Sequence, residues 1–80
     1  MDAFRLSSAL PGDTLRIKEL LFPTSICRRF MDMGLFPGTI VNCLLYAPSG
    51  SPVLLEVKGF RLALRRCDCN QIMVNICDQH

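Results

Sequence analysis

The sequence predicts one mainly β domain, a small five-stranded barrel with a single inserted α-helix. Short stretches of alternating apolar and polar residues are separated by closely spaced Gly and Pro turns, a pattern typical of antiparallel strands. The chain has 80 residues, 50% of them apolar, which leaves room for one thin core. No repeat, low-complexity tract or linker divides it. We therefore expect residues 1–80 to form a single domain, with a core over about residues 6–76, and strands this short favour a barrel over a sandwich.

The first strand is expected over residues 14–18. Leu15 and Ile17 fall on one face of this stretch, and two cations fall on the other. Residues 11–13 read Pro-Gly-Asp and predict a turn immediately before the strand.

A helix is expected next, with Thr24 as its N-cap. Ile26, Phe30 and Met33 recur at helical spacing and form an apolar face, and charged residues occupy the opposite face. Gly34 follows as the C′ residue that ends the helix.

Four more strands are expected along the rest of the chain. They share the period-two pattern of strands and cover residues 39–46, 53–58, 61–65 and 72–76. In the first of these, Val41, Cys43 and Leu45 share one face, so Cys43 occupies a position suited to Val.

Charge and hydropathy argue against two classes of partner. The formal net charge is only +2, far below the dense positive charge that holds a phosphate backbone, so we expect no nucleic-acid partner. The longest unbroken apolar run, residues 43–47, is much shorter than the roughly 18 residues that cross a bilayer, so we expect no membrane insertion.

The start of the chain and its cysteines indicate a cytoplasmic protein. Residues 1–5 carry an acid where a secretory signal has basic residues, and no apolar segment follows. In the cytoplasm the 5 cysteines are expected to stay reduced, which favours thiols or metal ligands over a disulfide framework.

The inventory of reactive side chains predicts a protein that is not an enzyme. The only histidine is His80, the last residue, where nothing holds it near a nucleophile. Glu19 and Glu56 fall on separate predicted elements, which gives no support for a carboxylate pair. The glycines lie too far apart to form a phosphate-binding loop.

Residues 28–39, RRFMDMGLFPGT, resemble the signature of the FeoA family, small proteins of bacterial ferrous-iron uptake. The family pattern is two basic residues, an apolar pair, Asp, an apolar residue, Gly-Leu, a variable position and Pro-Gly-Thr, and every fixed position matches. Residues 52–66, PVLLEVKGFRLALRR, resemble the family's strand, Gly-aromatic bend and following strand. The chain departs from the family at Phe22 and Pro23, where a Gly turn is commoner, and in its number of cysteines.

This resemblance implies an SH3-like barrel with a helix inserted after an early strand and a short helical turn before the last strand. It also implies an accessory, regulatory module of ferrous-iron uptake that docks on the cytosolic G-protein portion of the membrane transporter FeoB and influences its opening or nucleotide cycle. A monomer or weak dimer is expected. The same domain type is the last domain of iron-dependent repressors, so a stand-alone sensor domain is an alternative function. The sequence shows no helix-turn-helix like that of the repressors.

The partner-binding surface is expected around Arg28, Arg29, Met31, Leu35 and Phe36. Other apolar residues already form the side of the helix that faces the core, so Met31, Leu35 and Phe36 are not needed there. Aromatic and Met side chains suit a docking surface. Phe36 and Met31 would be anchors, and the two arginines would orient the partner. Two alternatives stay open: adjacent arginines are often only a solvated helix face, and Leu35 could close the end of the barrel.

One arrangement near the C-terminus resembles a metal site, made of Cys67, Cys69, Cys77 and His80. Thiolates and an imidazole suit a transition metal ion such as zinc or iron, so a metal or thiol carrier is an alternative function. The spacing is not that of zinc fingers. If residues 66–71 form a helical turn, Cys67 and Cys69 diverge by about 200°, and if they form a strand, the two share a side. Small buried hydrophobes are the competing interpretation.

Overall fold

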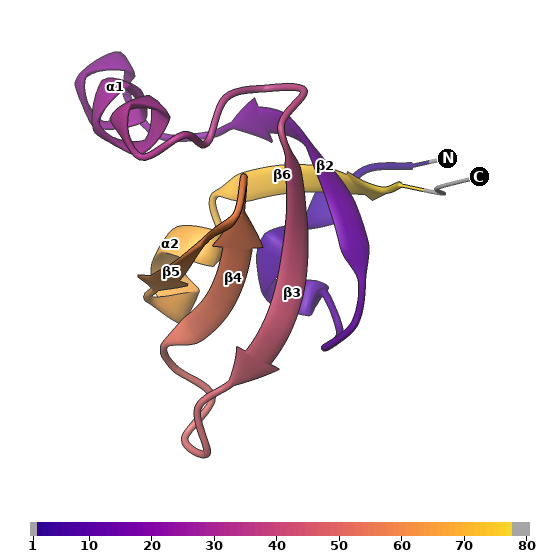
Figure 1. The fold of residues 1–80 in the computed structure, drawn as a ribbon. Helices are drawn as coiled ribbons and strands as arrows, with labels where there is room; N and C mark the ends of the chain where they lie inside the picture. The colour runs from indigo at the N-terminus through magenta and orange to yellow at the C-terminus, as the bar shows by residue number, and fades with distance from the viewer. Residues whose placement is uncertain (1, 78–80) are drawn as a thin grey trace.

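The computed structural model describes residues 2–77, whose strands form one antiparallel sheet. In chain order its elements are β1 (Phe4–Arg5), the 3-10 turn η1 (Leu6–Ser8), β2 (Thr14–Leu20), α1 (Thr24–Asp32), β3 (Ile40–Tyr46), β4 (Val53–Val57), β5 (Phe60–Leu64), α2 (Arg66–Cys69) and β6 (Ile72–Ile76) (Figure 1). The strand order is β1-β6-β2-β3-β4-β5.

The mainly β fold, the inserted α1 and the short α2 before the last strand are as the sequence predicts. The predicted five-stranded barrel differs from the observed sheet, which has six strands and stays open between β1 and β5. The added strand is β1, where Phe4 pairs with Val74. A strand of two residues is too short to show a period in the sequence.

The sheet is strongly bent, so β6 runs across the direction of β3 and β4 in Figure 1. Two bulges lie in the ladders, one between Ile17 and Glu19 and one between Cys43 and Leu45, and bulges bend and twist the strands that carry them. The second bulge overturns one prediction: the extra residue moves Leu45 off the face of Val41, and its side chain is 49% exposed. Leu45 is therefore a surface residue.

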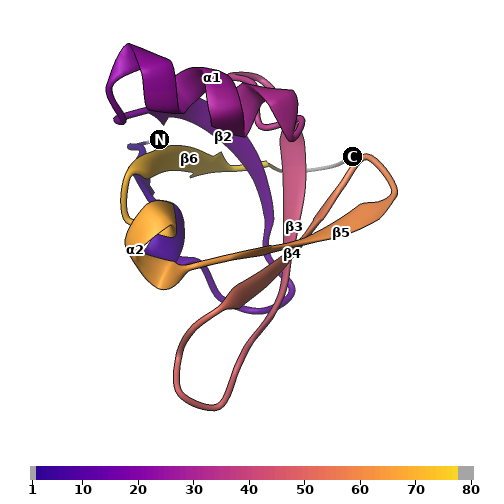
Figure 2. The same ribbon diagram turned by 90° about the vertical axis from the view of Figure 1, so that its left-hand side faces the viewer.

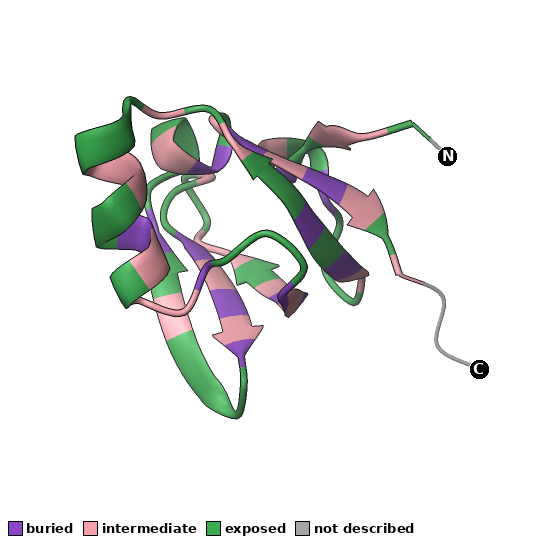
Figure 3. Ribbon diagram, turned by 90° about the horizontal axis from the view of Figure 1, so that it is seen from above, coloured by how far each residue is buried: buried purple, intermediate pink, exposed green. Residues whose placement is uncertain are grey.

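The core fills the concave side of this bent sheet. Buried residues alternate with exposed ones in β2 and with intermediate ones in β4, as the purple bands between green and pink in Figure 3 show. The fully buried side chains of largest volume form one cluster: Leu6, Leu15, Ile17, Leu35, Leu55, Ile72, Val41, Val53, Val57, Val74, Cys43 and Cys69. The alternation that the sequence predicts in β2 and β4 is confirmed by this cluster.

The two ends of α1 differ in how well the sequence predicts them. Thr24 is the first helical residue and makes no capping hydrogen bond, so its prediction as the N-cap is wrong; Pro23 holds that position. Gly34 ends the helix as predicted, with φ of +95°. Its N–H donates to the Met31 carbonyl at 2.8 Å, and the Leu35 N–H donates to the Phe30 carbonyl at 3.1 Å, which together make a Schellman motif.

Helix α1 lies across one end of the bent sheet (Figure 2). It is attached through Phe30, which is buried, and through Ile26 and Met33, which pack partly buried against the core. The Phe22 ring stacks on Phe30 with centroids 4.4 Å apart and planes 2° from parallel. Few side chains therefore hold α1 in place.

Candidate docking surface

Two aromatic side chains are exposed where the loop after α1 meets the turn between β4 and β5. Phe36 and Phe60 are each 46% exposed. The Lys58 Nζ lies 5.9 Å from the centroid of the Phe36 ring, and a Cβ built on Gly34 would lie 3.7 Å from Cζ of Phe60. We call Phe36, Lys58 and Phe60 the aromatic surface. The fold therefore brings side chains from two segments to the same place.

The predicted arginines lie on the neighbouring helix. Arg28 and Arg29 are both exposed on α1, and within residues 2–77 no ion pair involves either of them. Met31 is half-buried, so only part of its side chain is open to a partner. The structure therefore leaves both cations available and limits Met31 to a smaller contact.

Leu35 does not belong to the docking surface. Its side chain is fully buried in the core, which removes it from the residues predicted to bind a partner. The cause is the Schellman motif: the residue after the C′ glycine turns back beneath the helix, and its N–H bonds to Phe30. Leu35 therefore packs inside the fold, one of the two roles that the sequence left open.

Sequence reasoning missed Phe60. The sequence assigns Phe60 to a bend before a strand, and aromatic residues in strands usually pack against one face of the sheet. Phe60 is instead the first residue of β5 and stays largely exposed, outside the core. The Gly59-Phe60 dipeptide is the one feature of the sequence that could have indicated this exposure. Gly59 has φ of +88° in a tight turn, and such a turn projects the side chain that follows it.

The candidate metal ligands are not brought together. Cys67 is exposed and Cys69 is buried on α2, as the helical alternative for residues 66–71 requires. Cys77 lies at the far end of β6, beside the start of β2, and β6 separates it from α2 by roughly 13 Å. No group of three potential ligands occurs within residues 2–77, and His80 lies outside the described residues.

Cys69 is also poorly placed to bind a metal ion, because its side chain is fully buried in the core. Burial raises the pKa of its thiol to about 12, and the neighbouring Asp68 carboxylate acts in the same direction. Among residues 2–77, Cys67, Cys69 and Cys77 therefore do not form one metal site in this arrangement.

The other two cysteines act as packing residues. Cys27 is a half-buried residue of α1, and its Sγ donates to the Phe22 carbonyl at 3.1 Å. Cys43 is buried in the core, where burial raises the pKa of its thiol and a hydrogen bond from Tyr46 opposes that rise. Cys43 fills the small apolar position that the sequence predicts for it, and Cys27 packs in the same way against the segment before the helix.

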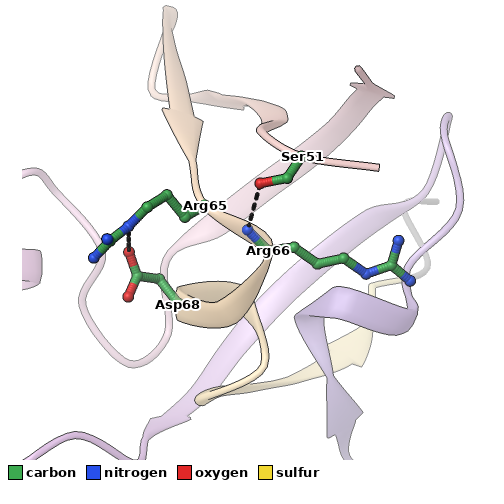
Figure 4. A network of polar contacts seen from close by, with 4 residues as sticks. All are labelled: Ser51, Arg65, Arg66 and Asp68. Carbon is green, nitrogen blue, oxygen red and sulfur yellow. Dashed lines mark hydrogen bonds and ion pairs between the residues drawn. The ribbon is translucent and has the colours of Figure 1, made fainter. Parts of the chain in front are cut away.

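Polar contacts fix α2 against the loop before β4 (Figure 4). The Arg66 N–H donates to Oγ of Ser51 at 3.1 Å, and Nε of Arg65 donates to Oδ2 of Asp68 at 3.3 Å. The Arg66 guanidinium lies 5.4 Å from the centroid of the Tyr46 ring. These contacts set the direction in which the chain leaves β5.

Comparison with known proteins relates this fold to one family. A family model described as the FeoA domain matches residues 4–76. The FeoA protein of Chlorobium tepidum is 31% identical, with a TM-score of 0.87 over 94% of this chain and 71% of that chain. The FeoA-like protein of Clostridium acetobutylicum is 25% identical, with a TM-score of 0.87 over 100% of this chain and 93% of that chain.

A third solved structure is that of the FeoA protein of Stenotrophomonas maltophilia complexed with zinc. It is 25% identical, with a TM-score of 0.76 over 90% of this chain and 89% of that chain. That protein is described as a prokaryotic SH3 domain protein and a candidate activating factor of ferrous iron transport. No curated protein matches the chain. No helix within residues 2–77 is long and apolar enough to cross a membrane.

Proposed function

The chain belongs to the FeoA domain family, and from that premise we propose that it docks on the cytosolic G-protein portion of the FeoB transporter as a non-enzymatic accessory module. The family is one of accessory proteins of iron uptake. Docking in the cytoplasm would let the module influence the opening or the nucleotide cycle of the transporter.

The exposure of Phe36 is the observation that carries the proposal. A phenyl ring that is 46% exposed gains favourable free energy when a partner covers it, and aromatic anchors commonly dominate binding energy. Phe60 is equally exposed, two residues along the chain from Lys58, whose ammonium group lies over the Phe36 ring. The aromatic surface thus has the composition of an interface centre, an apolar patch with a polar rim.

Arg28 and Arg29 would steer the encounter. They carry positive charge on the exposed side of α1 with no ion pair inside residues 2–77, so an acidic partner surface would attract them. Such rim charges act mainly on the association rate and make it dependent on salt. Met31 would add a smaller, adaptable contact.

A binding measurement with purified proteins tests this proposal. The G-protein portion of the transporter is immobilised, and the captured amount of the wild-type chain is compared with that of Phe36→Ser. We expect Phe36→Ser to weaken binding by about tenfold, since hot-spot truncations cost at least this much. Its melting temperature should stay close to that of the wild type, because Phe36 lies outside the core.

Leu45→Ser is the matched control, since Leu45 is 49% exposed but lies toward the opposite end of β3. It should bind as the wild type does. Equal binding by Phe36→Ser would remove Phe36 as an anchor, and absence of any wild-type binding would overturn the docking proposal itself.

The alternative functions have less support. A metal carrier would need ligands that converge, and the cysteines of residues 2–77 do not converge. A stand-alone sensor domain would need a separate DNA-binding partner. We therefore retain the docking module as the proposed function.

A further inference from the structure

Strand β5 is an edge strand with one side open. It pairs with β4 alone, and within residues 2–77 no backbone hydrogen bond joins its other side to another segment. Residues 58 and 59 join the two strands, so Val57 and Phe60 form the hydrogen-bonded pair that closes the hairpin. Because such pairs alternate with non-hydrogen-bonded ones, Arg61 and Ala63 direct their N–H and C=O groups away from β4. These four groups are free to pair with another strand.

A groove lies at the C-terminal end of this open edge. It is lined on one side by α1 and on the other by the end of β5 and α2, through Ile26, Arg29, Phe30, Met33, Ala63, Leu64, Arg65 and Asp68. Ala63 and Leu64 point to opposite faces of the strand, so a groove that both line reaches the edge itself. We call it the β5 groove. An added strand would place every second side chain against the apolar residues of α1.

The charge around the β5 groove selects the occupant. Arg29, Arg61 and Arg65 are exposed on its two walls and on the strand, and Asp68 pairs with Arg65. Within residues 2–77 no ion pair involves Arg29 or Arg61. The net positive charge favours an acidic segment. A second copy of this chain fits poorly, because antiparallel pairing of β5 with itself would bring the arginines of both copies together.

We propose that β5 binds an extended acidic segment of another protein as a seventh strand, with alternate apolar side chains in the β5 groove. The segment makes main-chain hydrogen bonds with Arg61 and Ala63 and ion pairs with Arg29. This interaction shares Arg29 with the docking proposed above and adjoins the aromatic surface at Phe60, but it does not require the partner proposed there.

A random-peptide display selection against the folded chain tests this inference. Enriched peptides should carry Asp or Glu together with apolar residues at every second position. One enriched peptide, labelled with fluorescein, is then titrated with the chain and its variants by fluorescence anisotropy. Ala63→Pro should weaken binding by about tenfold, because proline removes the outward N–H and places its ring at the edge. Ala63→Ser keeps that N–H and should bind within about twofold of the wild type.

The fold of Ala63→Pro can be checked separately. The Ala63 N–H takes no part in the ladder with β4, and proline is tolerated at such outward edge positions, so the melting curve should show a cooperative transition. Arg29→Gln should weaken binding of the labelled peptide by about threefold at low salt, and the loss should be smaller at high salt.

Three results of the peptide experiments would overturn the inference, and a fourth comes from the oligomeric state. These are selection of no peptide, selection of basic peptides or peptides with helical periodicity, and equal binding of the peptide by folded Ala63→Pro. Dimerisation of the wild type that Ala63→Pro abolishes would identify a second copy as the occupant and would also refute the proposal. None of these results bears on capture by the G-protein portion, so the two proposals can fail independently.

Discussion

Cys67 and Cys69 differ in chemistry although only one residue separates them. On α2 the first thiol faces water and the second is fully buried, because residues two apart on a helix point in different directions. Burial keeps the Cys69 thiol neutral, as its pKa of about 12 expresses. At the residue scale, Cys69 is therefore a small apolar core residue, and Cys67 is an accessible thiol.

The raised pKa of Cys69 predicts a loss of stability at alkaline pH. The folded chain keeps the thiol proton up to about pH 12, whereas an ordinary thiol, with pKa 9.0, loses it sooner. The folded state therefore binds more protons between these values, and the free energy of unfolding falls as pH rises through this window. Burial also raises the pKa values of Cys43 and Tyr46, which act in the same direction.

Urea unfolding at pH 8, 9 and 10 measures this effect. Cys69→Ala should reduce the fall in unfolding free energy over this range, since alanine has no proton to lose. Cys67→Ala is the control and should leave the fall unchanged, because that thiol is exposed in the folded chain. Identical pH profiles for wild type and Cys69→Ala would contradict the assignment.

At the scale of elements, α1 depends on a small number of aromatic contacts. Phe30 is its one buried residue, and the ring of Phe22 stacks on it from the segment before the helix. Since α1 forms one wall of the β5 groove and precedes the aromatic surface, these two rings position both proposed sites.

Truncation of these rings should destabilise the fold by different amounts. Phe30→Ala should lower the free energy of unfolding by about 3 kcal/mol, as expected for loss of a buried phenyl ring. Phe22→Leu keeps apolar volume but loses the stacked pair, which should cost about 1 kcal/mol. Phe60→Leu, at an exposed position, should stay within about 0.5 kcal/mol of the wild type. Urea unfolding measures all three, and a Phe30→Ala cost no larger than that of Phe60→Leu would refute the attachment of α1 through Phe30.

The elements also show which parts of the fold could be predicted from the sequence. Periodicity predicts α1 and five of the strands because each buries one regular face. It fails at Leu45, since a bulge inserts one residue and reverses the face, and bulges carry no periodic signal. It also misses β1, a two-residue strand that exists through its pairing with β6. Leu35 could have been predicted as buried from the helix-ending Gly34, because the Schellman motif turns the next residue inward.

At the scale of the whole molecule, both proposed sites depend on the open edge of the sheet at β5 and on the position of α1 near it. The sheet stays open, which leaves β5 as a free edge, and α1 lies across that end of the molecule (Figures 1 and 2). The sequence pointed to Phe36, Arg28 and Arg29 because they lie in one recognisable segment. It could not place Phe60 and Ala63 beside that segment, because their proximity depends on tertiary packing between distant parts of the chain.

The most direct test of the central claim is the rate of ferrous-iron uptake by cells that produce the transporter. Radioactive ferrous iron is supplied to cells without the chain, and to cells complemented with the wild type, Phe36→Ser or Leu45→Ser at equal protein levels. We predict that Phe36→Ser leaves uptake at the rate of cells lacking the chain, whereas Leu45→Ser restores the wild-type rate. Full restoration by Phe36→Ser, or no difference between cells with and without the wild-type chain, would contradict the account.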